Sequence, residues 1–391
     1  MQMKVKLGDM FEIGSGGTPS KTHPEYYGGD IPWVKTGDLK SEYLYEVEDF
    51  ITEEGLNNSS AKVYDTDTVL IAMYGATIGA TSILKMSACT NQACAAFKKN
   101  EKVIPEYLYY FLKSQKEKFV RDGVGGAQPN ISAGYLKKVE MELPSLEEQK
   151  VIVEILDKIS EVVLKRNQEI QVLDDLIKAR FVEMFGDPKI NPFNWNVVNI
   201  SQIVSGKVSN GFFARRDDYC DDGNVGVLGV ANIVNRMYSK IEELPRTNAN
   251  DEDIKKFEVK YGDMLFCRSS LVAEGIGKAS IIPKNIQRNI LFECHVIRLP
   301  LDLKICIPEF IQTLSTMNFF RNQIIAQSKT ATMTTIGQDG ILKADIILPP
   351  IEKQKDFYNF VHQVDKLKLQ VQKSLDETQI LFDSLMQQYF G

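Results

Sequence analysis

The chain has 391 residues, of which 43% are hydrophobic and 25% are charged, which is the composition of a globular protein with two or three domains. No apolar run approaches the ~20 residues that a membrane span needs. The first ten residues, MQMKVKLGDM, do not form a signal peptide, so we expect a cytoplasmic protein.

The cysteines and histidines give no sign of a metal site. The six cysteines are scattered, mostly inside apolar segments, and none belongs to a CxxC pair. The three histidines do not provide a zinc-ligand spacing either. We therefore expect free, buried thiols in a reducing compartment and no bound metal.

The first segment, residues 1–143, is predicted to form a globular domain. An apolar stretch enters a glycine-rich turn at residues 14–21, and a short strand and turn follow at 31–39. Two strands around a glycine-containing turn are expected at 65–84, and a short helix with aromatic residues on one side at 104–119. The polar loop GVGGAQPNIS then leads into a strand of alternating polar and apolar residues.

A long helix is predicted from Pro144 to Gly186. Ser145 can cap its first turn, and Glu148 completes a capping box. Gly186 supplies the stop, because glycine accepts the left-handed conformation that ends many helices, and Pro188 cannot continue the helix.

The next segment, residues 187–348, repeats the order of parts found in the first. It has an opening strand and turn, two strands around a glycine turn at 261–282, an aromatic helix at 307–320 and a polar loop at 328–337. The loop sequences differ between the two segments, as expected when one scaffold presents two different surfaces. The chain then ends on a second long helix, predicted at 349–391.

The two helices are copies of each other, offset by 205 residues without a gap. Of the 56 pairs aligned from Ile131 and Ile336 onward, 11 are identical. Both copies place apolar residues at heptad spacing, at 8 of 11 positions each. The sequence therefore predicts an α+β protein, in which two globular domains related by a pseudo-twofold axis are separated by a pair of long antiparallel coiled-coil helices.

The net charge of −6 is unevenly distributed. Residues 146–186 and 351–391 of the two predicted helices hold −4 of it, and the remaining 309 residues hold −2. Charge therefore neither supports nor excludes a polyanionic partner, and a basic surface must be a local patch.

Two stretches are similar to parts of an S-adenosylmethionine-dependent methyltransferase. FEIGSGG, residues 11–17, lacks the helix and acidic residue that should follow a cofactor loop. INPF, residues 190–193, lacks the second proline of an adenine-gripping loop and directly follows the helix stop. The sequence shows no pattern typical of a catalytic triad or a carboxylate pair. His295 lies between apolar neighbours and is expected in the core. The sequence thus favours a binding protein over a catalyst.

The polar loops supply candidate contacts to DNA. Lysine and arginine can pair with phosphates, whereas asparagine, glutamine, serine and threonine can pair with base edges. The predicted DNA-binding residues are Thr18, Ser20, Lys21, Lys35, Thr36, Gln128, Asn130, Asn210, Arg215, Arg216, Asn232, Arg268, Ser269, Lys278, Lys329 and Thr332.

Together these features resemble the specificity subunits of type I restriction-modification systems. The resemblance covers essentially the whole chain. It is carried by KLGDMFEIGSGGTPSK, IPWVKTGDL, the GGAQPNIS loop, the MFGDP…NP…W segment and the two helix entries LPSLEEQK and LPPIEKQK. The second copy departs mildly, since it has Lys353 in place of the second glutamate and a first loop without GTPSK.

The resemblance implies a non-catalytic subunit of a restriction endonuclease and methyltransferase complex. Residues 1–143 and 187–348 are then target-recognition domains that each read half of a split double-stranded DNA sequence. The helices at 144–186 and 349–391 set the spacing and dock two methyltransferase subunits, which modify adenine at N6, and restriction (translocase) subunits can join. S-adenosylmethionine, ATP and Mg are expected on those partners and no cofactor on this chain. The expected spacer or docking residues are Glu147, Gln149, Lys150, Leu156, Ile159, Val163, Ile170, Glu352, Gln354, Lys355, Val364 and Leu375.

Two alternatives remain open at this point. One is a stand-alone DNA adenine methyltransferase, which would bind the cofactor as a purified chain. The other is a non-catalytic scaffold, in which a coiled coil joins two ligand modules and DNA methylation does not depend on the chain.

Overall fold

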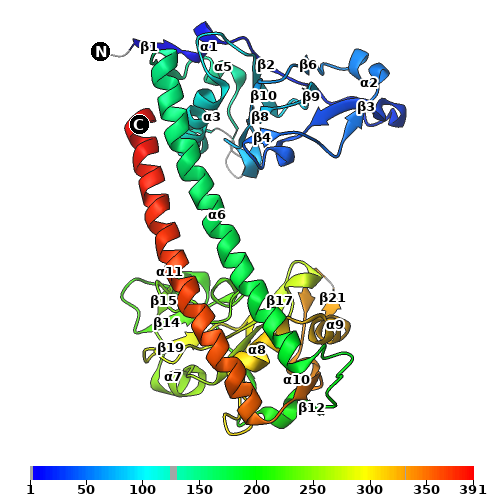
Figure 1. Cartoon of the computed structure of the whole chain (residues 1–391), viewed down its shortest axis with the longest axis vertical. Coiled ribbons are helices and arrows are strands. Elements are labelled where there is room, and N and C mark those ends of the chain that lie inside the picture. Colours follow the sequence, from blue (N-terminus) through cyan, green and yellow to red (C-terminus); the bar gives the residue numbers. More distant parts are fainter. Residues whose placement is uncertain (1–2, 124–129, 331) are drawn as a thin grey trace. The chain divides into compact units, whose positions relative to one another are not determined.

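The computed structural model describes residues 3–123, 130–330 and 332–391 (Figure 1). They form two compact units, which we call the first unit (residues 1–167 and 373–391) and the second unit (residues 168–372). Each unit contains one globular part and one half of each long helix. The assignment of residues 1–143 and 187–348 as separate recognition domains stays a prediction. Within the described residues, no helix is long and apolar enough to cross a membrane.

The globular part of the first unit consists of two sheets and a strand pair that leads into the long helix. The five-stranded sheet has the order β2 (Ile13–Ser15), β10 (Cys94–Phe97), β7 (Val69–Ala72), β8 (Thr81–Leu84) and β4 (Tyr43–Leu44). The four-stranded sheet has the order β5 (Phe50–Ile51), β3 (Tyr27–Val34), β9 (Ala88–Thr90) and β6 (Val63–Tyr64), and the strand pair is β1 (Met3–Lys6) with β11 (Glu140–Leu143). The helices are α1 (Leu7–Met10), α2 (Glu53–Asn57), α3 (Pro105–Ser114), α4 (Lys116–Asp122) and α5 (Ala133–Leu136).

The globular part of the second unit has the corresponding elements. One sheet has the order β13 (Ser209–Asn210), β20 (Val296–Pro300), β16 (Asp263–Cys267) and β18 (Ala279–Ile281), and another has β15 (Arg246–Thr247), β14 (Val225–Leu228) and β19 (Ile290–Phe292). The strand pair is β12 (Asn196–Asn199) with β23 (Asp345–Leu348). A small additional sheet consists of β17 (Ser269–Ser270), β22 (Thr334–Thr335) and β21 (Lys329–Thr330). The helices are α7 (Asp251–Phe257), α8 (Pro308–Thr316), α9 (Asn318–Ala326) and α10 (Gln338–Leu342).

The shared topology extends the duplication from the helices to the globular parts. β7 lies between β8 and β10 as β16 lies between β18 and β20, and β3 pairs with β9 in parallel as β14 pairs with β19. The two strands predicted at 65–84 are β7 and β8. The prediction of one aromatic helix in each copy is wrong in detail, since a break at Gln115 and at Met317 divides it into two helices.

The long helices α6 (Leu146–Phe185) and α11 (Ile351–Phe390) have 40 residues each. The predicted capping box is present, because Ser145 Oγ accepts from Glu148 N (3.3 Å) and Glu148 Oε2 accepts from Ser145 N (2.8 Å). Gly186 ends α6 with a φ of +75°, as expected for a helix-terminating glycine.

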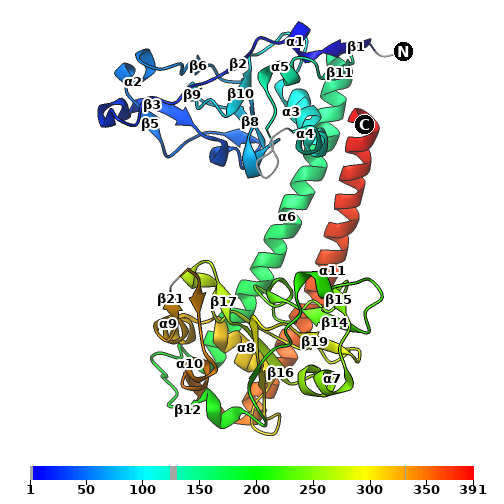
Figure 2. The same ribbon diagram turned by 180° about the vertical axis from the view of Figure 1, so that it is seen from behind.

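The two helices lie side by side in antiparallel directions (Figures 1 and 2). α6 begins in the first unit and ends in the second, whereas α11 begins in the second and ends in the first. All eleven heptad positions predicted in each helix are buried or half-buried. Lys368 Nζ also forms an ion pair with Asp174 Oδ1 at 2.5 Å within the second unit. The predicted α+β class and the long antiparallel helix pair are confirmed, whereas the pseudo-twofold relation between the units stays a prediction.

Aromatic residues attach each helix end to a globular core. In the second unit, the ring of Phe181 at the end of α6 stacks on Phe310 of α8 (5.2 Å) and meets Phe357 of α11 edge-on (5.5 Å). In the first unit, Phe390 at the end of α11 lies edge-on to Tyr107 of α3 (5.2 Å). The end of one helix thus packs beside the beginning of the other in both units.

One buried glutamine joins the start of each long helix to its globular part. Gln149 is fully buried, its Oε1 accepts from Ile104 N (2.9 Å), and its Nε2 donates to Lys102 O (2.9 Å) and Pro144 O (3.0 Å). Gln354 makes the same three kinds of bond with Ile307 N, Ile305 O and Pro349 O. The glutamine of each helix entry, Gln149 or Gln354, therefore holds the start of its helix to the globular part by hydrogen bonds. We call these two residues the glutamine joints.

Replacement of this glutamine should destabilise the first unit. Gln149→Leu conserves side-chain size but leaves three backbone groups without their partners, so we expect the free energy of unfolding to fall by about 2–4 kcal/mol. Urea denaturation measures the change. Gln168→Leu, at an exposed position of the same helix, is the control and should cost little. Equal stability of the Gln149 variant and the wild type would contradict the role of the joint.

A buried glutamate in α8 should make the stability of the second unit depend on pH. Glu309 is 1% exposed, its Oε1 accepts from Tyr238 Oη (3.2 Å), and its Oε2 has no described partner. Burial raises the pKa of Glu309. Because the folded state resists ionisation, stability should decline as the pH rises from the unfolded-state pKa through the folded-state pKa.

Glu309→Gln is therefore expected to raise the melting temperature at pH 8, with a gain that shrinks toward pH 4, because glutamine keeps the acceptor for Tyr238 and carries no charge. Glu106 occupies the equivalent position in the first unit and has Lys85 Nζ at 3.7 Å from its Oε1. Glu106→Gln should instead lower the melting temperature at pH 8. Calorimetry across pH measures both changes, and a destabilised Glu309→Gln variant at pH 8 would refute the assignment.

Candidate nucleic-acid interface

In the first unit, three backbone hydrogen bonds bring the ends of several elements to one edge. Asn91, after β9, donates to Val34 O at the end of β3 (2.9 Å). Met73, after β7, donates to Ala93 O (2.8 Å) and accepts from Ile131 N (3.0 Å). The ends of the parallel strands, the β7–β8 turn and the loop before α5 are therefore neighbours.

The second unit repeats the same three bonds. Glu293, after β19, donates to Leu228 O at the end of β14 (2.9 Å). Arg268, after β16, donates to His295 O (2.8 Å) and accepts from Ile336 N (3.0 Å). We call this edge the loop edge of each unit. Because it carries different side chains on the same backbone arrangement, it can recognise two different ligands of one class.

Two equivalent glycines let the opening strand of each unit approach this edge closely. A Cβ on Gly16 would lie 1.7 Å from Thr90 O, and one on Gly211 would lie 2.1 Å from Phe292 O. In the glycine-rich run at residues 11–17, Gly16 thus packs against the end of β9, while Gly14 packs against Tyr64 and Gly17 against Ser60 and Ala61. This role accounts for its glycines without a cofactor.

Three predicted residues of the first unit lie at or beside the loop edge. The hydroxyl of Thr18 donates to Gln92 Oε1. Lys35 follows β3, and its ammonium forms an ion pair with Asp49. Thr36 begins the single 3₁₀ turn after that strand. The side chains of Thr18 and Lys35 thus have partners within the unit.

The loop before α5 also contributes to this edge. Asn130 is exposed and pairs with Tyr74 in an isolated β-bridge. Gln128 lies outside the described residues.

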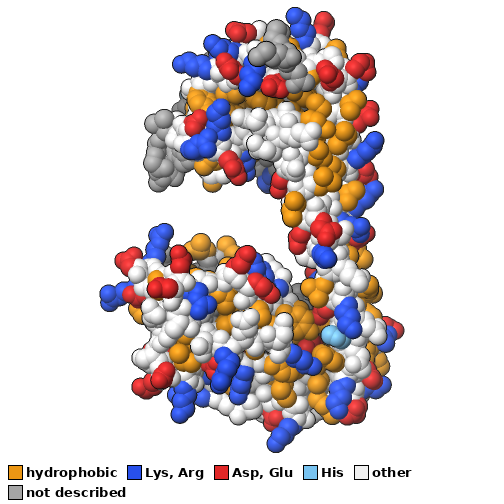
Figure 3. All heavy atoms as spheres, turned by 90° about the vertical axis from the view of Figure 1, so that its left-hand side faces the viewer, with side chains coloured by type: hydrophobic (Ala, Val, Ile, Leu, Met, Phe, Trp, Pro, Cys, Tyr) orange, Lys and Arg blue, Asp and Glu red, His pale blue; other side chains and the backbone are white. Residues whose placement is uncertain are grey.

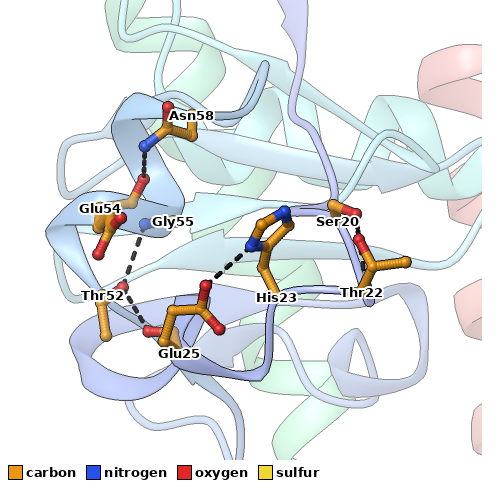
Figure 4. A network of polar contacts seen from close by, with 8 residues as sticks. All are labelled: Ser20, Thr22, His23, Glu25, Thr52, Glu54, Gly55 and Asn58. Carbon is orange, nitrogen blue, oxygen red and sulfur yellow. Dashed lines mark hydrogen bonds and ion pairs between the residues drawn. The ribbon is translucent and has the colours of Figure 1, made fainter.

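Ser20 and Lys21 lie farther along the loop between β2 and β3 that also contains Thr18. Figure 4 shows the polar network that holds this loop to the start of α2. Ser20 Oγ bonds with Thr22 Oγ1 (2.7 Å), and His23 Nδ1 lies 2.8 Å from Glu25 Oε1. The hydroxyl of Ser20 therefore has a structural partner, whereas Lys21 is exposed.

The second unit gathers more of the predicted residues. Ser269 and Lys278 line a shallow depression of about 470 Å³, together with His295 and Met333. Arg268 lies next to Ser269, and its guanidinium donates to Cys294 O (3.3 Å). Lys278 Nζ donates to Asn235 Oδ1 (2.8 Å). The small sheet adds Lys329 on β21 and Thr332 in the following turn, both exposed.

Two of the predicted asparagines have partners within the unit. Asn232 caps its own turn, accepting from Gly229 N (3.0 Å) and donating to Lys240 O (3.3 Å). Asn210 accepts from Gln338 Nε2 (3.2 Å). Arg215 and Arg216 are exposed in the loop after β13.

His295 corrects the sequence analysis. The prediction of a core histidine is wrong, because His295 is exposed in the turn between β19 and β20, with its Nδ1 3.3 Å from Ser269 Oγ. The available signal was the pair of polar residues Glu293 and His295 between two buried apolar strands, which is typical of a turn.

The INPF stretch is a linker. Asn191 has a φ of +49°, and its side chain bonds with both backbone groups of Trp195. Pro192 lies against Gly186. The residues thus shape the turn that leaves α6.

The cysteines and other possible metal ligands can be compared with the prediction of buried free thiols and no bound metal. All six cysteines are free, but Cys220 and Cys294 are half-buried, so the prediction of buried thiols holds only for the other four. In the described part of the chain, no three His, Cys, Asp or Glu side chains are grouped to hold a metal ion.

The predicted spacer or docking residues divide by burial. Leu156, Val364 and Leu375 are buried, as are the two glutamine joints, while Ile159, Val163 and Ile170 are half-buried along the helix seam. Two ion pairs, Glu147–Lys150 (3.5 Å) and Glu352–Lys355 (2.8 Å), are exposed at the helix starts. These four side chains are the exposed members of the predicted set.

Comparison with known proteins identifies the family. The family described as "Type I restriction modification DNA specificity domain" matches residues 2–174 and again residues 192–378. This chain belongs to that family. The family model thus matches each of the two copies of the repeat separately.

Curated relatives agree with this assignment, and a solved structure has a similar fold. The chain is 25% identical to the type I restriction enzyme MjaIX specificity subunit of Methanocaldococcus jannaschii, over 97% of this chain and 90% of that protein. It is 22% identical to the EcoKI specificity subunit of Escherichia coli K12, over 92% and 82%. The crystal structure of the type I S subunit from M. genitalium matches with a TM-score of 0.52 at 12% identity, over 100% and 96% of the two chains.

Family membership establishes the general role. The chain is a type I specificity subunit, which determines DNA target recognition and is itself non-catalytic. Such subunits work within type I restriction-modification complexes on DNA, and the cofactors reside on the other subunits. The alternatives of a stand-alone methyltransferase and a scaffold unrelated to DNA are therefore set aside.

Proposed function

We propose that the chain reads a bipartite DNA target, with one half-site bound by the loop edge of each unit. The duplicated set of three backbone bonds carries this proposal, because it places different polar residues on the same edge in both units. Lysines, arginines and amide or hydroxyl side chains on these edges suit phosphates and base edges. Positive and negative side chains are intermixed on the face that Figure 3 displays. Because this face has no extended basic surface, the proposed contacts to DNA phosphates depend on individual lysines and arginines.

The long helices act as a ruler between the half-sites. A helix of 40 residues spans roughly 60 Å at about 1.5 Å per residue. This length corresponds to at most roughly 15–18 base pairs at ~3.4 Å each. The target then consists of two unlike short sequences separated by a fixed, non-specific spacer.

Repeated exposed leucines support the docking of two identical partner subunits. Leu164 and Leu369 occupy equivalent positions in the two helix copies and are 58% and 70% exposed. Leu176 and Leu381 are likewise equivalent and are 44% and 51% exposed. Each unit contains one leucine of each kind. Apolar side chains that both copies keep exposed suit burial by a partner.

The partners in this proposal are two methyltransferase subunits, which modify adenine at N6 with S-adenosylmethionine, and restriction (translocase) subunits that use ATP and Mg. The complex works in the cytoplasm, where the free cysteines stay reduced.

Co-purification with the methyltransferase subunit tests the docking. Native mass spectrometry should give two methyltransferase subunits per chain. Leu164→Asp with Leu369→Asp should release them, because a charge replaces apolar contact at both sites. Val151→Asp, at another exposed apolar position of α6, is the control, at 56% exposure. A complex with one methyltransferase subunit, or one unaffected by the leucine changes, would oppose the proposal.

A further inference from the structure

The hairpin at the loop edge is longer in the second unit than in the first. A backbone bond from Gly79 N to Ala72 O (2.9 Å) closes the β7–β8 turn, and an equivalent bond from Gly277 N to Cys267 O (2.8 Å) closes the β16–β18 turn. Six residues lie between the first pair and nine between the second. The turn of the second unit is therefore three residues longer.

The longer turn exposes large apolar side chains. Leu271 is 81% exposed and Val272 is 58% exposed, and the nearby Met333 is 37% exposed. The equivalent turn of the first unit, between Ala72 and Gly79, exposes one large side chain, that of Tyr74 (43%), which precedes Gly75–Thr77 as Val272 precedes Ala273–Gly275. It has no residue that corresponds to Leu271. Leu271 gains nothing from the fold at this exposure, so its apolar surface suits burial against a ligand.

Basic residues flank this apolar tip. Arg268 precedes it, Lys278 closes the same hairpin, and Lys329 is exposed on the neighbouring small sheet (β17 and β21 in Figures 1 and 2). Leu271 also lines the depression that contains Ser269. Cations around an apolar projection match the charge pattern of a duplex, whose phosphates surround stacked, apolar base faces.

We propose that the Ser270–Val272 tip is a wedge that inserts Leu271 between stacked base pairs of the half-site bound by the second unit. Side chains such as leucine unstack base steps in this way and bend the duplex toward additional protein contacts. In the first unit, the described turn exposes no large aliphatic side chain, and its Tyr74 is paired with Asn130, so the Leu271 wedge acts at one half-site. This inference rests on the proposed function and specifies how one of its two sites engages DNA.

Fluorescence of 2-aminopurine tests the wedge, because unstacking of this base raises its emission. Once the target is known, the complex of the chain with its methyltransferase subunits is bound to duplexes that carry 2-aminopurine at successive positions, omitting the methylated adenines. We expect a rise at one step in one half-site only. Leu271→Ala should abolish this rise and weaken binding roughly tenfold, with the salt dependence unchanged.

Two matched variants accompany Leu271→Ala. Ile190→Ala, at a linker position that is 73% exposed, should behave as wild type. Lys278→Ala should reduce the slope of log affinity against log salt by about one. Specific methylation without any fluorescence rise, or an unchanged rise in Leu271→Ala, overturns the wedge alone. Loss of methyltransferase subunits from Leu271→Ala would instead assign the tip to protein docking. Absence of chain-dependent methylation would overturn the proposed function itself.

Discussion

Insertion of four residues between Asn167 and Gln168 in α6 is expected to abolish methylation at the original target. The insertion adds about 6 Å to one helix and rotates the following residues by about 40° relative to those before it. Because α6 and α11 pack along a shared seam, the change disturbs their register and separates the half-site readers. Sequencing of methylated adenines measures the result.

A matched insertion of four residues between Gln372 and Lys373 restores equal helix lengths, since these positions are offset by 205 from the first site. The double variant is expected to methylate sites whose spacer is longer by up to roughly two base pairs. Retention of the original spacer by either variant would contradict the ruler.

Phe181→Ala should cause the largest loss of stability among the single substitutions considered. Its side chain is fully buried and contacts the rings of Phe310 and Phe357 at 5.2 and 5.5 Å. We expect the free energy of unfolding of the second unit to fall by about 3–5 kcal/mol, since truncation removes apolar contact and leaves a cavity.

Hydrogen exchange of amides in α8 measures this loss locally, which avoids assuming that the two units unfold together. Val182→Ala, at the next position of α6 and 45% exposed, serves as the control and should leave exchange nearly unchanged. Similar protection of α8 in the wild type and the Phe181 variant would contradict the role of the aromatic attachment.

Periodic features were predictable from the sequence. The helix bounds, the capping box at Ser145 and the stop at Gly186 follow from local chemistry, and the heptad pattern identifies the seam because only one stripe of each helix is buried. The duplication also revealed the two similar globular parts, because their strands and turns occur in the same order.

Features that depend on tertiary contacts were not predictable. The role of Gln149 requires backbone groups at 102, 104 and 144 to converge on one side chain, which no spacing shows. His295 was misplaced because its apolar neighbours flank a turn. The loop edge depends on hydrogen bonds between strand ends that are distant in the sequence, so the sequence did not predict it. Candidate residues were therefore chosen by residue type alone, and they include Ser20 and Asn232, whose polar groups have partners within the fold.

The central claim is that this chain directs a methyltransferase to a bipartite DNA sequence. Sequencing of N6-methylated adenines in cells that express the methyltransferase subunit with and without this chain tests it most directly. We predict methylation at one bipartite sequence with a fixed spacer, present only with the chain. An unchanged methylation pattern without the chain, or methylation at one continuous sequence, would contradict the account.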